Sequence, residues 1–257
     1  MAEPDVLEGA LRIARVEYPD LDVDRTRALL EELARKAAER IVGRDRRALA
    51  QLNSYFFDEL GFHGNTDDYE DPRNSYLNDV LERRTGIPIT LSTVYCEIAR
   101  RAGLPASGVG FPGHFLVACP VGRSEVLIDC FHGRVLTRED CQELLDSTRS
   151  GATLTEDMFA VASPRDILSR MLNNLRRIHE GRGDLPRVLR WIEMDMELRP
   201  DDPRNYRDRG ILRAQTEDFG KALSDFEQYA RLAPGAPDLP QIRQQIRLLG
   251  KLLSNLN

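Results

Sequence analysis

The sequence has little cysteine and little tryptophan: four cysteines and one tryptophan occur in 257 residues. The cysteines, at positions 96, 119, 130 and 141, are too few and too widely spaced for a disulfide framework. No basic and apolar N-terminal segment of the secretory type precedes them. We therefore expect reduced thiols and a cytoplasmic protein.

Long apolar runs and blocks of positive charge are also missing. No apolar stretch approaches the roughly 20 residues that cross a bilayer, so we expect no membrane contact. The chain has 36 Lys and Arg side chains against 42 of Asp and Glu, a net charge of −6. Because the basic residues form no long block, we expect no direct contact with nucleic acid.

The remaining composition is that of a folded protein. With 41% hydrophobic and 30% charged residues, the chain can bury a core and is not a disordered sequence. At roughly 150 residues per domain, its length predicts two packed units or one large unit with an appendage.

The first half of the chain reads mainly as helices. Apolar residues recur at three- and four-residue steps through the first sixty positions, whereas the polar residues 62–75 are expected to form a loop. A short helix around Leu77 should follow. A clearer, buried helix is expected over residues 88–102, with Pro88 suited to its first turn and Gly103 to its exit.

After this helix the apolar period changes from 3.6 to 2. Four short segments, ASGVGF, GHFLVACP, SEVLIDCF and GRVL, are rich in strand-forming residues and separated by glycine and proline. They predict three or four antiparallel strands, two of them joined in a hairpin around Val121 to Ser124. The fold class expected from the whole pattern is α+β.

Strand patterns are absent from Ser163 onward. We place a domain boundary near residue 160, which gives an N-terminal domain of residues 1–160 and a helical domain of residues 161–257. An internal period of 34 runs through the helical domain and relates, for example, Pro200 to Pro234.

The second copy of this period, with Gly210, Ala222 and Phe226, resembles the tetratricopeptide pattern. Its small residues would let two antiparallel helices approach closely. The resemblance implies a protein-binding tail, and a final helix is expected from about Pro240.

His114 and Asp129 are the strongest pair of candidate site residues. Their positions sum to an odd number, as the paired positions of a hairpin with a two- or four-residue loop do, so both side chains share one sheet face. A carboxylate that orients a histidine is half of a nucleophilic triad. The alternative, which spacing alone favours, is a hydrogen-bonded pair that supports a buried sheet.

The segment from SYLNDV to DCFHG closely resembles the bacterial SirB-type family, which has a transglutaminase-like core and tetratricopeptide-type helices. The likeness is strongest from Asn74 to Gly133, where a helix, GLP, FPGHFLV and LID follow in one order. The resemblance implies a transglutaminase or papain-like fold, in which a cysteine begins the buried helix and a histidine and an aspartate follow on strands. His114 and Asp129 match the last two.

The cysteine has no counterpart. In transglutaminase-like sequences a Gly-x-Cys step opens the helix, and here that step reads Gly86, Ile87, Pro88. Proline cannot form a thiolate. Cys96 lies eight residues along the same helix, about 12 Å away, and cannot simply replace it.

Other chemistry near this helix has weaker support. Ser92 or Thr90 could supply a hydroxyl nucleophile, although residues of this kind at helix starts usually cap the helix or bond to carbonyls. Arg83 and Arg84 could meet an anionic partner, or simply close the preceding helix. Cysteines 119, 130 and 141 with His132 lack the paired spacing of zinc sites, and strand parity places Cys119 and Cys130 opposite His114. We therefore predict no metal and no cofactor.

The expected function is a non-catalytic transglutaminase-like module that binds a protein or peptide, with a possible regulatory role. The alternative is an active hydrolase or acyl-transferase that uses Ser92 or another relocated nucleophile, with His114 and Asp129 as its base pair. A third reading is a scaffold in which that pair is purely structural. The sequence indicates neither the partner's identity nor an oligomeric state.

Overall fold

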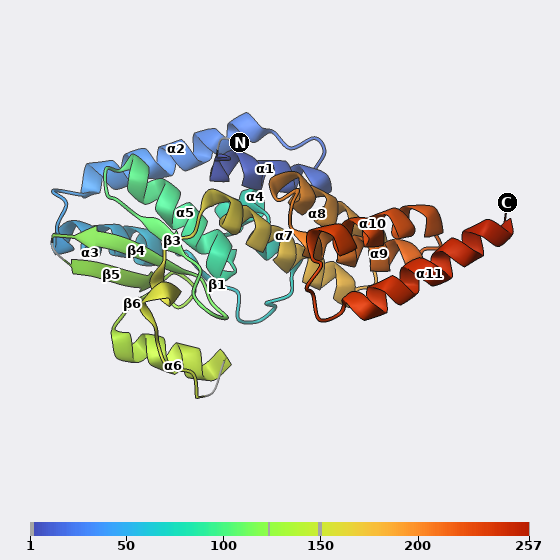
Figure 1. Cartoon of the computed structure of the whole chain (residues 1–257). Coiled ribbons are helices and arrows are strands. Elements are labelled where there is room, and N and C mark those ends of the chain that lie inside the picture. The colour runs from blue at the N-terminus through green and yellow to red at the C-terminus, as the bar shows by residue number, and fades with distance from the viewer. Residues whose placement is uncertain (1–2, 123, 149–150, 257) are drawn as a thin grey trace. The chain divides into compact units, whose positions relative to one another are not determined.

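The computed structural model describes residues 3–122, 124–148 and 151–256 (Figure 1). The chain divides into two compact units, Met1–Met171 and Leu172–Asn257. Helices and two small sheets make up the first unit, so the predicted α+β class is confirmed. Among the described residues, no helix has both the length and the apolar character needed to span a bilayer.

The first three helices begin where aspartate side chains accept hydrogen bonds from free backbone N–H groups. Asp5, Asp22 and Asp45 cap the first three helices in this way. The helices that begin in this unit are α1 (Val6–Glu17), α2 (Val23–Arg40), α3 (Arg46–Asn53), α4 (Leu77–Arg83), α5 (Pro88–Arg101), α6 (Arg138–Thr148) and α7 (Pro164–Gly181).

Two local features differ from the sequence prediction. The third helix continues as a π-helical segment, η1 (Ser54–Glu59), and Phe56 there stacks on Phe62 with ring centroids 4.3 Å apart. The predicted loop of residues 62–75 contains a strand, β1 (His63–Gly64), and a 3₁₀ turn, η2 (Pro72–Asn74). Strand β1 pairs in parallel with β2 (Thr85–Gly86). Two-residue strands are too short to show any alternation in sequence.

The larger sheet has the strand order β3-β4-β5-β6 and is antiparallel throughout. In β4 and β5, Val117 faces Ile128 and Val121 faces Ser124, so a two-residue loop joins the strands as predicted. Residue 123 of this loop lies outside the described residues. The strands are β3 (Ser107–Val109), β4 (Leu116–Val121), β5 (Ser124–Asp129) and β6 (Arg134–Leu136).

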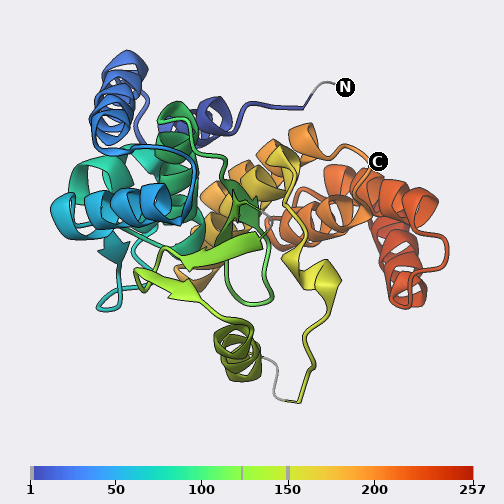
Figure 2. The same cartoon turned by 90° about the vertical axis from the view of Figure 1, so that its left-hand side faces the viewer.

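Helices α5 and α6 lie on opposite sides of this sheet (Figure 2). Helix α5 is almost wholly buried, as its apolar pattern predicted. On the other side, Leu116, Ala118 and Leu127 pack with Cys141 and Leu145 of α6. Helix α6 begins with the predicted reciprocal cap, in which Thr137 and Asp140 bond to each other's backbone N–H groups.

In the described residues of the second unit, all secondary structure elements are helices. After the end of α7 these are α8 (Leu185–Leu198), α9 (Pro203–Gln215), α10 (Phe219–Leu232) and α11 (Leu239–Leu256). The bounds of α8 and α10 repeat with the period of 34 found in the sequence. The division between the units falls after Met171, within α7, whereas the predicted boundary at 160/161 lies just before that helix. The boundary at 160 stays a prediction.

Candidate functional site

His114 and Asp129 form the pair that strand parity predicted. His114 Nε2 lies 2.9 Å from Oδ1 of Asp129, which ends β5. Both residues are buried: Asp129 is fully buried, and His114 is 8% exposed. His114 stands in the turn just before β4, so it reaches Asp129 diagonally across the hairpin.

A second histidine, His132, binds the same carboxylate. Its Nδ1 lies 2.6 Å from Asp129 Oδ2, and its ring stacks beside that of His114 with centroids 5.9 Å apart. An ionised carboxylate can only accept hydrogen bonds, so both nitrogens that face Asp129 must donate. In the neutral rings, the free lone pairs are then on His114 Nδ1 and His132 Nε2.

Asp129 is held as an anion. Burial favours its neutral acid, but hydrogen bonds from His114 and then His132, together with their electrostatic attraction, outweigh burial and keep the pKa of Asp129 far below its ordinary value. The backbone N–H groups of Phe131 and His132 also donate to Oδ1, at 3.0 and 3.3 Å. The carboxylate is therefore fixed in direction as well as charge.

Arg170 of α7 holds the turn that carries His114. Its guanidinium donates to the carbonyl oxygens of His114, at 2.7 Å, and Phe111, and it lies over the Phe115 ring. Burial lowers the pKa of Arg170. No sequence pattern indicates this residue, because it comes 56 positions after His114 and no periodic signal joins them.

Pro88 begins α5 as predicted, in the first helical turn, and is buried. The neighbouring Thr90 closes the helix start: its hydroxyl donates to the Asn74 carbonyl at 2.7 Å and accepts from the Ile87 N–H. Thr90 thus has a capping role. The first turn of α5 therefore carries no ionisable nucleophile.

Ser92 is fully buried on α5, and its hydroxyl donates to the Phe115 carbonyl at 3.5 Å. It also interacts with the thiol of Cys130. In the part of the chain that the structure describes, the His114 ring has its hydrogen bond with Asp129 and none with Ser92. Ser92 as a nucleophile remains a prediction.

The four cysteines are free and buried. Burial raises the pKa of Cys96 and Cys119 to about 12, that of Cys141 to about 11, and that of Cys130 well above its usual value. At neutral pH these thiols stay protonated and are poor nucleophiles.

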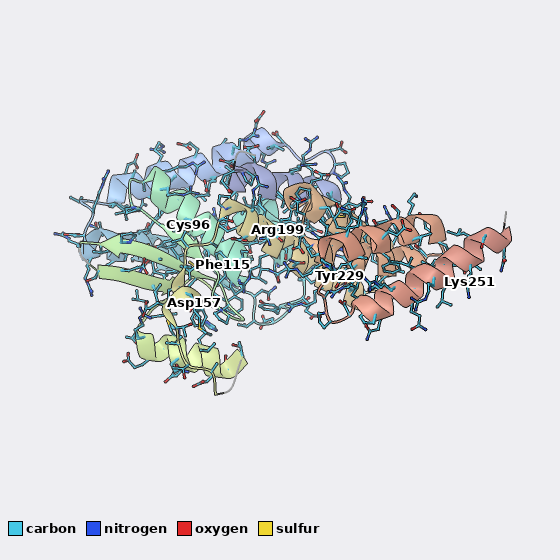
Figure 3. All side chains as sticks on the ribbon, viewed as in Figure 1. Cys96, Phe115, Asp157, Arg199, Tyr229 and Lys251 are labelled. Atoms are coloured by element: carbon cyan, nitrogen blue, oxygen red, sulfur yellow. The ribbon has the colours of Figure 1, made fainter. Side chains whose placement is uncertain are left out.

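A cavity of about 200 Å³ lies between α5 and the sheet edge, lined by Cys96, Ser92, Phe115, Glu97 and Arg100 among others. Figure 3 labels Cys96 and Phe115 within the first unit. Most of the lining surface is apolar. Neither His114 nor Asp129 lines this cavity, so it is separate from the histidine pair.

Among the described residues, His132 groups with His114 and Asp129 rather than with the cysteines considered for zinc. Arg83 contacts Asp71 at 3.3 Å. Arg84 is the left-handed cap of α4 and lies over the Phe62 ring. Both arginines thus lie at the C-terminal end of α4, and contact with an anionic partner stays a prediction.

Comparison with known proteins identifies the family. A model of the transglutaminase-like superfamily matches residues 24–173, more than half of the chain. The chain belongs to this superfamily. A tetratricopeptide-repeat model matches residues 175–247 of the same transglutaminase-like protein, so the predicted combination of core and tail is confirmed.

Relatives cover most of this transglutaminase-like chain. A protein named UPF0162 from Xylella fastidiosa strain Temecula1 is 38% identical over 246 residues, which is 93% of this chain and 87% of the relative. A UPF0162 protein of Vibrio cholerae is 27% identical over 252 residues, 95% of this chain and 92% of its own. Human F-box only protein 21 is 35% identical over 144 residues, 52% of this chain and 22% of its own.

Proposed function

We propose that this protein is a catalytically degenerate transglutaminase-like module that binds a protein or peptide, with a regulatory role in the cytoplasm. The SirB-type resemblance of the GIP, GLP, FPGHFLV and LID segments is the finer family assignment that we propose. The observation that carries the proposal is Pro88, which starts α5 at the position where the family places its nucleophilic thiol.

The chemistry of the other groups supports the same conclusion. A helix N-terminus activates a cysteine by lowering its pKa, but the proline ring has no proton to lose. The native thiols are elsewhere, and burial raises the pKa of each one. His114 and Asp129 are retained as a base and its orienting acid, and among the described residues the His114 ring has no hydrogen bond to a thiol or hydroxyl group.

Binding capacity is supported by the second unit. Tetratricopeptide helices are used in protein binding. This unit carries a groove whose lining combines apolar and charged side chains: Leu185, Val188, Ile192, Ile211 and Leu212 with Arg176, Glu180 and Asp208. Ile211 is 42% exposed there. A surface groove of a helical repeat that offers both apolar and charged side chains suits a peptide, which presents both kinds of group.

The test is labelling of the intact, folded chain with iodoacetamide at pH 7.5, followed by mass spectrometry. We expect slow and substoichiometric labelling that is the same in the wild type and in His114→Ala. All four thiols should react once the protein is denatured. Rapid modification of one cysteine that depends on His114 would show a working nucleophile and would overturn the proposal.

A hydrolase or acyl-transferase that uses Ser92 is the second candidate, because the geometry of His114 and Asp129 is that of a base and its orienting acid. A fluorophosphonate probe distinguishes the two proposals. The enzyme proposal requires labelling that is lost in both Ser92→Ala and His114→Ala. The binding-module proposal requires none.

A further inference from the structure

Three side chains of types that can bind metal ions meet at the end of β5. The donor atoms of His114, Asp129 and His132 all lie within 4.8 Å of one another. Two imidazoles and one carboxylate form a typical ligand set for zinc and other first-row transition metals. We propose that these three residues bind a divalent transition metal ion such as Zn²⁺.

The two oxygens of Asp129 are used differently. Oδ1 already accepts three hydrogen bonds, from His114 Nε2 and from the backbone N–H groups of Phe131 and His132. Oδ2 accepts one, from His132 Nδ1. Oδ2 therefore keeps a lone pair that can bind a metal ion, while the backbone N–H groups that bind Oδ1 fix the direction of the carboxylate. Supporting hydrogen bonds of this kind orient the ligands of known metal sites.

Metal binding requires a shift of protons within the two rings and no loss of them. Each neutral imidazole now places its hydrogen on the nitrogen that faces Asp129. When that nitrogen binds the ion, the hydrogen moves to the other ring nitrogen, which is Nδ1 in His114 and Nε2 in His132. The carboxylate supplies one negative charge, so the ion and its ligands carry a net charge of +1.

The exposure of the three residues suits an ion that enters from solvent. Asp129 is fully buried and His114 nearly so, whereas the His132 side chain is 47% exposed. Bonds of about 2.1 Å place tetrahedral ligand atoms roughly 3.4 Å apart. His132 Nδ1 now lies 2.6 Å from Asp129 Oδ2, so its ring must move away from that oxygen by somewhat less than about 1 Å to admit the ion. The half-exposed His132 side chain has room for this movement. Three protein ligands leave a coordination position for water.

The experiment measures Zn²⁺ binding by the full chain, without a histidine tag and after dialysis against a chelator. Isothermal titration calorimetry at pH 7.5 would compare the wild type with His132→Gln, His114→Gln and the control His63→Gln. His63 is an exposed histidine bonded to the Gly61 carbonyl and Thr85, outside the proposed site. Thermal unfolding would confirm that each variant is folded.

We expect one equivalent of Zn²⁺ in the wild type and in His63→Gln, with an affinity at least about tenfold weaker in His132→Gln and His114→Gln. If His114→Gln fails to fold, the affinity of His132→Gln for Zn²⁺ decides the test, because the His132 side chain is partly exposed. Equal affinity in the wild type and His132→Gln, or no binding by the wild type, would overturn the proposal. The iodoacetamide and fluorophosphonate experiments do not depend on this result.

Discussion

Gly64 and Phe131 join the two small strands of the first unit to the turn that carries the histidine site. The Gly64 N–H donates to the Phe131 carbonyl at 3.0 Å, and a Cβ built on Gly64 would lie 2.4 Å from the Phe131 ring. A close approach of this kind leaves room only for hydrogen at position 64. Phe131 in turn lies edge-on to His114, with ring centroids 6.3 Å apart.

Gly64→Ala should therefore destabilise the first unit. We expect a loss of about 1 to 3 kcal/mol in the free energy of unfolding, because the partly buried Phe131 ring must move. Gly110→Ala is the matched control, since its nearest neighbour, an Arg170 nitrogen, would lie at an ordinary 3.8 Å. Chemical denaturation followed by circular dichroism would compare them. Equal stability of the two variants would contradict the expected clash.

The lowered pKa of Asp129 predicts a pH dependence of stability. A carboxyl group with a lower pKa in the folded state than in the unfolded state stabilises the protein above its unfolded value, about 3.9, and this contribution is lost as the pH falls below that. Asp129→Asn should lower stability by about 3 kcal/mol at pH 7, because it breaks a buried pair.

Urea denaturation from pH 3 to pH 7 would measure this. The fall in stability towards pH 3 should be shallower in Asp129→Asn than in the wild type, because the amide does not titrate. Exposed pairs such as Asp140 with Thr137 remain in both proteins and cancel in the comparison. Parallel pH curves would show that Asp129 has an ordinary pKa in the folded state.

Much of this site could be predicted from sequence, because the loop length of a hairpin determines which residues of its two strands face each other. With Val121 opposite Ser124, position 114 is one diagonal step from the partner of Asp129, so both side chains lie on the sheet face that also carries Leu116. The helix that begins at Pro88 was equally predictable, because proline at the start and glycine after the end mark both limits.

His132 could not be assigned in the same way. It follows Asp129 by three residues in a turn, where neither the helical nor the strand period applies, and its contact with Oδ2 depends on the fold of that turn. The link from Arg170 to His114 also depends on where α7 runs, which local pattern does not fix. His132 follows Asp129 by only three residues, and this short spacing is the sequence signal that could have indicated it.

Pro88→Cys tests whether α5 still begins beside a working base. The helix N-terminus should lower the pKa of the new thiol, and one unit below the ordinary value of about 8.5 gives roughly ten times more thiolate near pH 7. We expect the thiol introduced at position 88 to react with iodoacetamide at least about ten times faster than the native cysteines, and His114→Ala in the same background to slow it. Mass spectrometry over time would identify the modified residue.

Two controls limit the interpretation of that result. Thr85→Cys places a thiol on the partly exposed β2, before the helix, and reports access of the reagent alone. The base is tested separately by His114→Ala. If the Pro88→Cys thiol reacts no faster than the Thr85→Cys thiol, or if its rate is unchanged without His114, then α5 does not present position 88 to the imidazole. The transglutaminase-like correspondence of Pro88 would then be wrong.

Gly210 provides a test in the second unit, independent of the histidine site. A Cβ at this position of α9 would lie 2.7 Å from the Phe226 ring of α10, and that ring is buried at 2% exposure and cannot swing into solvent. Alanine gains about 1 kcal/mol of helix propensity over glycine, but overpacking a buried ring costs about 1 to 3 kcal/mol. Gly210→Ala should therefore be destabilising on balance.

Gly220→Ala is the control for this variant, because nothing lies within 4 Å of a Cβ at position 220 on α10. It should be neutral or stabilising by up to about 1 kcal/mol. The one tryptophan, Trp191, is buried in α8, so its fluorescence follows unfolding of the second unit specifically. A lower urea midpoint in Gly210→Ala than in Gly220→Ala would confirm that α9 and α10 need glycine for their close approach. The reverse order would show that the helices separate easily and that the tetratricopeptide spacing is not set at this contact.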